Sequence, residues 1–70
     1  MITYQPLLKK LEKKKMTLRD LMLETGIAPN TMTRIRKNET VSLEVLEKFC
    51  RVLNCDFKDV IGFIRDSGDA

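Results

Sequence analysis

The stretch from Thr17 to Asn38 constrains the fold more than any other, because helix start and stop signals follow one another within it. Thr17 and Asp20 have the spacing of a capping box, in which a hydroxyl and an acid satisfy each other's backbone N–H groups. Gly26 favours the left-handed conformation that ends a helix, and Pro29 suits the first position of the next one. The stretch therefore predicts two short helices joined by a tight turn at Gly26.

Apolar spacing predicts helices in most of the remaining chain. A first helix is expected from about Thr3 to Lys14, and a fourth from Ser42, which would cap it, to Asn54. A fifth helix would open at Asp56–Asp59 and bury four apolar side chains, Phe57, Val60, Ile61 and Ile64. No strand pattern is visible, so we expect an all-α fold of five helices. Its core would contain apolar residues at helical spacing, namely Leu21, Ile27, Met32, Ile35, Leu46, Phe49 and Leu53.

Length and composition exclude several classes of protein. The chain of 70 residues allows one small domain, 1–70, without a deep substrate cavity, and its end, residues 66–70, is expected to fray. It contains no histidine, which removes imidazole bases and every zinc site that needs a His ligand. Cys50 and Cys55 lack the spacing of a metal knuckle, so we expect buried free thiols in a reducing cytoplasm. No apolar stretch approaches the ~20 residues that span a membrane. We therefore expect a cytoplasmic protein that is not an enzyme and uses no cofactor, metal or membrane.

Positive charge is concentrated in the first half of the chain. The range Lys9–Lys37 contains nine basic and three acidic residues, a net charge of +6, whereas residues 38–70 contain four basic and seven acidic residues, a net charge of −3. This asymmetry favours a polyanion as the partner of the basic half. For the lysines of residues 9–15, the simpler interpretation of a solvent-exposed helix face stays open.

Two short helices joined by a tight turn form a helix-turn-helix motif, residues 17–37, whose second helix would present a polar side that fits the major groove of DNA. Residues 18–35, LRDLMLETGIAPNTMTRI, resemble the core of the phage-repressor, Cro-type (XRE) helix-turn-helix family, and the resemblance extends over about residues 3–64. It implies a five-helix, phage-repressor-like DNA-binding domain and a small cytoplasmic transcription regulator, a repressor, that binds double-stranded operator DNA. Two positions depart from the family pattern. Met22 replaces a small residue, and Ala28 replaces the usual Ser or Thr cap, which costs roughly 1 kcal/mol.

The resemblance also implies which residues contact DNA. Arg34 can donate two hydrogen bonds to guanine, Asn30 can pair with adenine, and Thr33 can meet a thymine methyl group or a phosphate. The residues implied to read bases are Pro29, Asn30, Thr33 and Arg34. The residues implied to bind phosphates are Thr17, Leu18, Lys37, Asn38 and Thr40. Further candidates for DNA contacts are Thr31 and Arg36.

One recognition helix reads too few base pairs to select a site in a genome, so the implied function argues for a pair of domains. The expected fifth helix cannot bury all of its apolar residues, and we expect a weak homodimer, formed fully on DNA, with Phe63 and Ile64 near its axis. The alternative to a DNA-binding regulator is a protein-interaction module, antitoxin-like or an adaptor, that holds a protein partner with its acidic C-terminal half.

Overall fold

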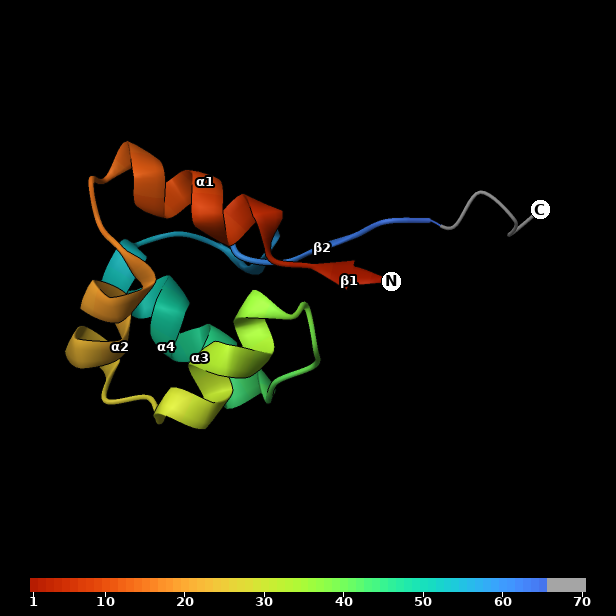
Figure 1. Cartoon of the computed structure of the whole chain (residues 1–70). Coiled ribbons are helices and arrows are strands. Elements are labelled where there is room, and N and C mark those ends of the chain that lie inside the picture. Colours follow the sequence, from red (N-terminus) through yellow and green to blue (C-terminus); the bar gives the residue numbers. More distant parts are fainter. Residues whose placement is uncertain (66–70) are drawn as a thin grey trace.

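The computed structural model describes residues 1–65, which form four α-helices, one short 3₁₀ helix and a two-stranded sheet (Figure 1). In chain order the elements are β1 (Ile2–Thr3), α1 (Gln5–Lys13), α2 (Leu18–Thr25), α3 (Pro29–Arg36), α4 (Leu43–Leu53), η1 (Phe57–Asp59) and β2 (Gly62–Phe63). The predicted frayed end, residues 66–70, lies outside the described residues. Across residues 1–65, every helix is too short or too polar to cross a membrane. The mainly helical fold is confirmed, but the predicted number of helices is not.

The start and stop signals of α2 and α4 act as predicted. Thr17 Oγ1 accepts the N–H of Asp20 at 3.1 Å, and the Asp20 carboxylate accepts the N–H of Thr17 at 2.9 Å. Gly26 ends α2 in the left-handed conformation, with φ of 72°. Ser42 caps the start of α4 through its hydroxyl, and Asn54 ends that helix with φ of 53°. Both helices therefore have the bounds that their caps specify.

The predicted core is confirmed, because each of its residues is at most 7% exposed. The same cluster also contains Tyr4, Leu7, Leu11 and Val60. α2 packs against both α4 and α3, and α1 packs against η1. Figure 1 shows α1 on one side of this core and the group of α2, α3 and α4 on the other. Burying one such side chain contributes about 1.5–3 kcal/mol, so the core fixes how α2 and α3 lie against each other.

The predicted fifth helix is wrong. Phe57–Asp59 form only the 3₁₀ helix η1, at whose start the Asp56 N–H donates to Asp59 Oδ2 at 3.1 Å and the Asp59 N–H donates to the Asp56 carbonyl oxygen at 2.9 Å. The chain then continues as β2 instead of as a helix. Of the four side chains expected to be buried, Val60 is buried and Ile61 is half-buried, whereas Phe57 is 46% exposed and Ile64 is 50% exposed.

The sheet formed by β1 and β2 corrects the expectation that the chain has no strand. The strands are antiparallel, with Ile2 opposite Phe63 and Thr3 opposite Gly62. A Cβ atom at Gly62 would lie 3.4 Å from the Thr3 side chain and 3.5 Å from that of Pro6, so this position of β2 packs against β1 and the start of α1. Because Ile2–Thr3 belong to β1, α1 begins at Gln5 rather than at about Thr3.

Candidate nucleic-acid interface

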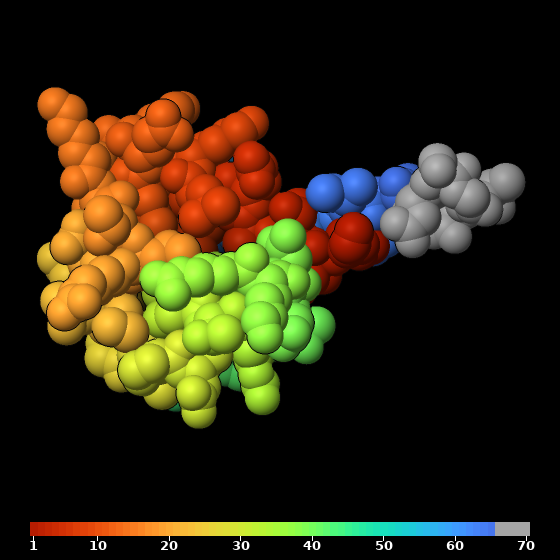
Figure 2. Space-filling view, viewed as in Figure 1, coloured from red at the N-terminus to blue at the C-terminus, as the bar shows by residue number. Residues whose placement is uncertain are grey.

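α3 has a buried face and an exposed face. Met32 and Ile35 point into the core, with 3% and 2% of their surface exposed. At 100° per residue, Asn30, Thr33 and Arg34 lie on the opposite side of the helix, and all three are exposed. Figure 2 shows this part of the chain, in yellow to green, with side chains that project from the surface. The three side chains expected to read bases by hydrogen bonds or methyl contact are thus brought together on one face.

The remaining predicted contact residues of α3 lie beside that face. Pro29 and Arg36 are exposed on the side of α3 that faces α2, whereas Thr31 is half-buried on the other side. The Thr33 hydroxyl donates to the Pro29 carbonyl oxygen at 3.2 Å. Its methyl group and its oxygen lone pairs remain available to a ligand.

A groove of about 230 Å³ separates the start of α2 from α3. Its lining residues are Leu18, Arg19, Met22, Pro29, Met32, Thr33 and Arg36. Arg19 of α2 and Arg36 of α3 therefore border the same groove. Arg19 could not be identified as a groove residue from the sequence, because only the packing of α2 on α3 places it beside α3. Met22, which departs from the family pattern, occupies part of the groove lining.

The N-terminus of α2 leaves two backbone N–H groups free beside this groove. The N–H groups of Thr17 and Asp20 bond within the capping box, and the N–H of Leu21 donates to the Thr17 carbonyl oxygen at 3.1 Å. The N–H groups of Leu18 and Arg19 have no acceptor within residues 1–65. Free N–H groups at the positive end of a helix dipole form an arrangement that can bind an anion.

Tyr4 connects the start of the chain to the C-terminal end of α3. The Tyr4 N–H donates to Asn38 Oδ1 at 3.0 Å, and the Tyr4 hydroxyl donates to the Glu39 carbonyl oxygen at 2.6 Å. Burial raises the pKa of Tyr4, so its hydroxyl stays a neutral donor. Because Asn38 Oδ1 accepts from Tyr4, the Asn38 Nδ2 group is left to donate elsewhere. This role of Tyr4 could not be predicted from the sequence, since its partners lie 34 and 35 residues away along the chain.

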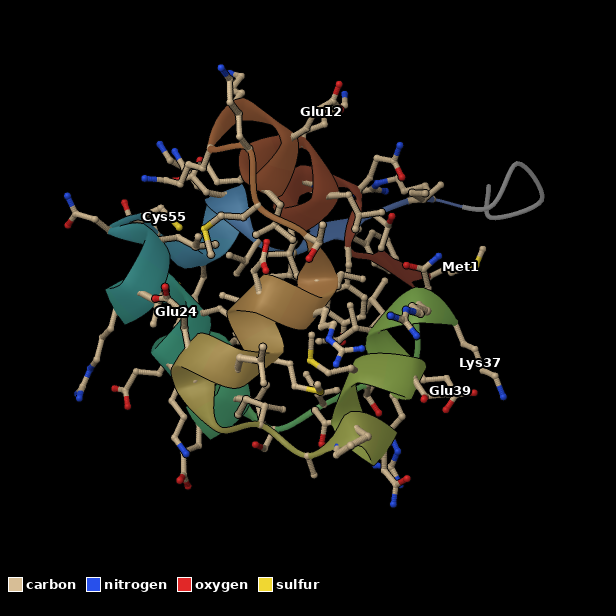
Figure 3. The ribbon with its side chains drawn as sticks, turned by 60° about the vertical axis from the view of Figure 1, so that its left-hand side comes forward. Met1, Glu12, Glu24, Lys37, Glu39 and Cys55 are labelled. Carbon is tan, nitrogen blue, oxygen red and sulfur yellow. The ribbon has the colours of Figure 1, made fainter. Side chains whose placement is uncertain are left out.

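The chain after α3 carries the other predicted phosphate contacts. Lys37 caps α3 and Asn38 is left-handed, with φ of 57°, and both are exposed, as is Thr40. Figure 3 shows Lys37 pointing away from the ribbon. The ion pair found within residues 1–65 joins Arg51 and Glu47 at 3.6 Å, on α4. The basic side chains of α3 and of the groove are therefore not neutralised by an ion pair with a described acidic residue.

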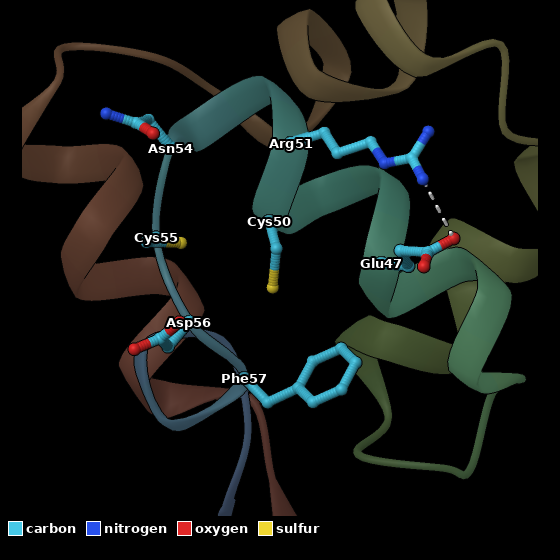
Figure 4. Close-up of a pocket in the computed structure, with 7 residues that line it drawn as sticks. All are labelled: Glu47, Cys50, Arg51, Asn54, Cys55, Asp56 and Phe57. Atoms are coloured by element: carbon cyan, nitrogen blue, oxygen red, sulfur yellow. Dashed lines mark ion pairs between the residues drawn. The ribbon is translucent and has the colours of Figure 1, made fainter.

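A second hollow, of about 330 Å³, lies in the acidic half, at the end of α4 (Figure 4). Its lining residues are Glu47, Cys50, Arg51, Asn54, Cys55, Asp56 and Phe57. Cys50 and Cys55 are free thiols, as predicted, but both are only half-buried. Burial and the proximity of Cys55 raise the pKa of Cys50, which keeps this thiol protonated. No group of three or more potential metal ligands occurs within residues 1–65.

Comparison with known proteins gives two matches. The family of Cro/C1-type HTH DNA-binding domains matches residues 7–66. Among solved structures, the crystal structure of the transcriptional regulator VanUg is similar to this chain, with a TM-score of 0.89 and 37% sequence identity. That similarity covers 93% of this chain and 87% of the other. No curated protein matches the sequence significantly.

Proposed function

Because the chain belongs to the family of Cro/C1-type HTH DNA-binding domains, we propose that it is a sequence-specific transcriptional regulator that reads the major groove of DNA with α3. The family match confirms the resemblance of residues 18–35. The observation that carries the proposal is the division of α3 into two faces. Met32 and Ile35 hold the helix on the core, and the opposite face presents exposed polar side chains to a ligand.

In this proposal the exposed face of α3 lies against base edges. The Asn30 amide matches adenine, and the Arg34 guanidinium matches guanine, each by two hydrogen bonds. The Thr33 methyl group would contact a thymine methyl group. Pro29, at the first position of α3, is also proposed to meet a base edge. Arg36 and the half-buried Thr31, on the two sides of α3, are proposed as additional DNA contacts.

Backbone phosphates would be bound on both sides of α3. On one side, the Leu18 N–H and the Thr17 hydroxyl lie at the positive end of α2, and Arg19 and Arg36 border the adjoining groove. On the other side the proposed phosphate ligands are Lys37, the Asn38 Nδ2 group and Thr40. These contacts fix the register of α3 on the duplex but carry no sequence information.

We further propose that the regulator is a repressor and that it acts in the cytoplasm, beside the DNA. A protein that occupies a site overlapping a promoter excludes the polymerase from it. One copy of α3 reads too few base pairs to select such a site, so a pair of copies would bind a symmetric operator. Transcription from a promoter that carries the selected site should fall when the protein is added, and a rise would make the protein an activator.

Selection of bound sequences from a random duplex pool, followed by mobility shift at rising salt, tests the proposal. We expect one enriched motif, and an affinity that falls with salt with a log–log slope of about −0.9 for each phosphate contact. Lys58 is an exposed lysine on η1, and Lys58→Ala is the matched control. This variant should select the same motif and show the same salt slope as the wild type. Equal binding of selected and random duplexes, or no shift at any salt concentration, would contradict the proposal.

A protein partner for the acidic half is a second candidate function, and it is compatible with the first. The hollow beside α4 favours it, because Phe57 is 46% exposed there and the carboxylates of Glu47 and Asp56 border it. A module that binds only protein would give no salt-dependent shift with duplex DNA. Phe57→Ala should lower the affinity for such a protein partner without changing the affinity for DNA.

A further inference from the structure

The two cysteines of the chain lie close together at the corner between α4 and η1. Cys50 belongs to α4, one turn before its end, and Cys55 follows the end of that helix. Both thiols are free and half-buried, and both line the hollow of about 330 Å³ at the end of α4. Figure 4 shows the two sulfur atoms directed into this hollow. Each thiol is therefore within reach of a small molecule that enters the hollow.

The backbone at the end of α4 holds the two residues against each other. Asn54 is left-handed, with φ of 53°, and the N–H of Cys55 donates to the Cys50 carbonyl oxygen at 3.0 Å. A bond of this kind across a left-handed residue defines the Schellman motif, in which the side chains at the two ends of the bond commonly pack together. The bond also keeps the two Cα atoms within about 7 Å, the limit beyond which a disulfide cannot form. The turn therefore places Cys50 and Cys55 where their sulfur atoms can be joined.

The ionisation of Cys50 is affected by the same proximity. Burial raises the pKa of the Cys50 thiol, and the neighbouring Cys55 raises it further. The thiolate is the form that attacks a disulfide, so the first attack falls to Cys55. Thiols of higher pKa are also released more slowly when their disulfide is attacked. A disulfide at Cys50, once formed, would therefore be slow to release this thiol.

We propose that Cys50 and Cys55 form a redox-sensitive dithiol site, which small-molecule disulfides such as oxidised glutathione convert into an internal disulfide in the folded protein. The Cys55 thiolate attacks one sulfur of the small disulfide, forms a mixed disulfide and releases one thiolate. The Cys50 thiolate then attacks the Cys55 sulfur and releases the second thiolate. The two released thiolates take up the two protons of the cysteines. One small disulfide is thus reduced to two thiols while the two cysteines are oxidised.

The new bond would connect the end of α4 to the segment that leads into η1. Both α1 and α4 pack against η1, so this corner joins elements from the two ends of the chain. A cross-link between residues 50 and 55 removes conformations from the unfolded chain, so the oxidised protein should be the more stable form. It would also take both thiols out of the wall of the hollow. The inference does not depend on the proposed binding of DNA.

Equilibration with mixtures of reduced and oxidised glutathione tests the site. The protein is used at low micromolar concentration, exchange is quenched with acid, and mass spectrometry separates the dithiol, the mixed disulfide and the internal disulfide. The wild-type chain should lose two hydrogen atoms as a monomer, and dithiothreitol should restore them. The same equilibration in denaturant gives the reference, and the internal disulfide should be favoured about ten-fold or more by folding. The oxidised chain should melt about 4 °C or more above the reduced chain.

Cys50→Ser and Cys55→Ser are the matched controls, because each keeps one thiol and should stop at the mixed disulfide. Thermal melting of the reduced forms shows whether each variant is folded, and the wild-type comparison in denaturant decides the question even where one is not. Equal formation of the internal disulfide in the folded and the unfolded chain would show that the two thiols only pack together, and would overturn the inference. Disulfide-linked dimers in place of the internal bond, or an oxidised chain with a Tm at or below that of the reduced chain, would overturn it as well.

Discussion

The titration of Tyr4 measures how the start of the chain is connected to the end of α3. Tyr4 is the only tyrosine, it is 1% exposed, and its hydroxyl donates to the Glu39 carbonyl oxygen at 2.6 Å. Burial raises its pKa above the ordinary value of about 10. The folded protein therefore keeps the hydroxyl protonated at a pH where the unfolded chain ionises it. The stability due to Tyr4 is fully present below pH ~10 and is lost as the pH rises through the folded-state pKa.

Tyr4→Phe removes the hydrogen bond and the ionisation but keeps the buried ring. A neutral hydrogen bond contributes about 1 kcal/mol, so the free energy of unfolding at neutral pH should fall by about that amount. For a domain of this size the corresponding fall in Tm is about 4–8 °C. Above pH ~10 the parent should lose about 1.4 kcal/mol for each pH unit between the unfolded and folded pKa values, so its advantage over Tyr4→Phe should shrink and, where those pKa values differ by about one unit or more, reverse.

Ultraviolet absorbance follows the tyrosinate of Tyr4 alone, because the chain has one tyrosine and no tryptophan. The midpoint in the folded protein should lie above the midpoint in denaturant. Thermal melting of the parent and of Tyr4→Phe across the same pH range supplies the second measurement. A tyrosine that titrates at the same pH in both states, or a Tm for Tyr4→Phe within about 1 °C of the parent, would refute the reasoning.

Two further predictions concern the helix-turn-helix, and both are checked by thermal denaturation followed by circular dichroism. Ile35→Ala removes a side chain that is 2% exposed and should lower the free energy of unfolding by about 2–5 kcal/mol, whereas Leu23→Ala, at a side chain 68% exposed, should change it by less than about 0.5 kcal/mol. An unchanged Tm for Ile35→Ala would show that Ile35 does not hold α3 on the core as described. Ala28→Ser supplies the missing side-chain cap of α3 and should raise stability by about 1 kcal/mol. A fall in Tm would contradict that cap.

The parts of the fold that could be predicted are those encoded by local signals. Thr17 and Gly26 specify the two ends of α2 through groups within a few residues of each other. The same holds for Ser42 and Asn54 at the ends of α4. The exposed face of α3 follows from helical spacing once Met32 and Ile35 are assigned to the core. That face could therefore be predicted from sequence, although its contacts with DNA stay a prediction.

The parts that could not be predicted depend on contacts between distant residues. β1 and β2 contain only two residues each, and they pair although they are about 60 residues apart along the chain. Strands this short have no alternation of apolar and polar residues from which they could be predicted. The apolar spacing of Phe57 to Ile64 suits a helix equally well, and the chain forms a strand there because β1 supplies hydrogen-bond partners. The bond from Tyr4 to Asn38 and the approach of Arg19 to α3 likewise exist only after the helices pack.

The central claim is that the exposed face of α3 reads DNA, and paired substitutions at Arg34 and Lys37 test it most directly. Affinities are measured for a selected duplex and a random duplex over a range of salt, with Lys58→Ala as the control. Arg34→Ala should cost about 1–3 kcal/mol on the selected duplex and little on the random one. Lys37→Ala should weaken both duplexes alike and reduce the salt slope by about one unit. Identical behaviour of the two variants on both duplexes, or no effect of either, would contradict the claim.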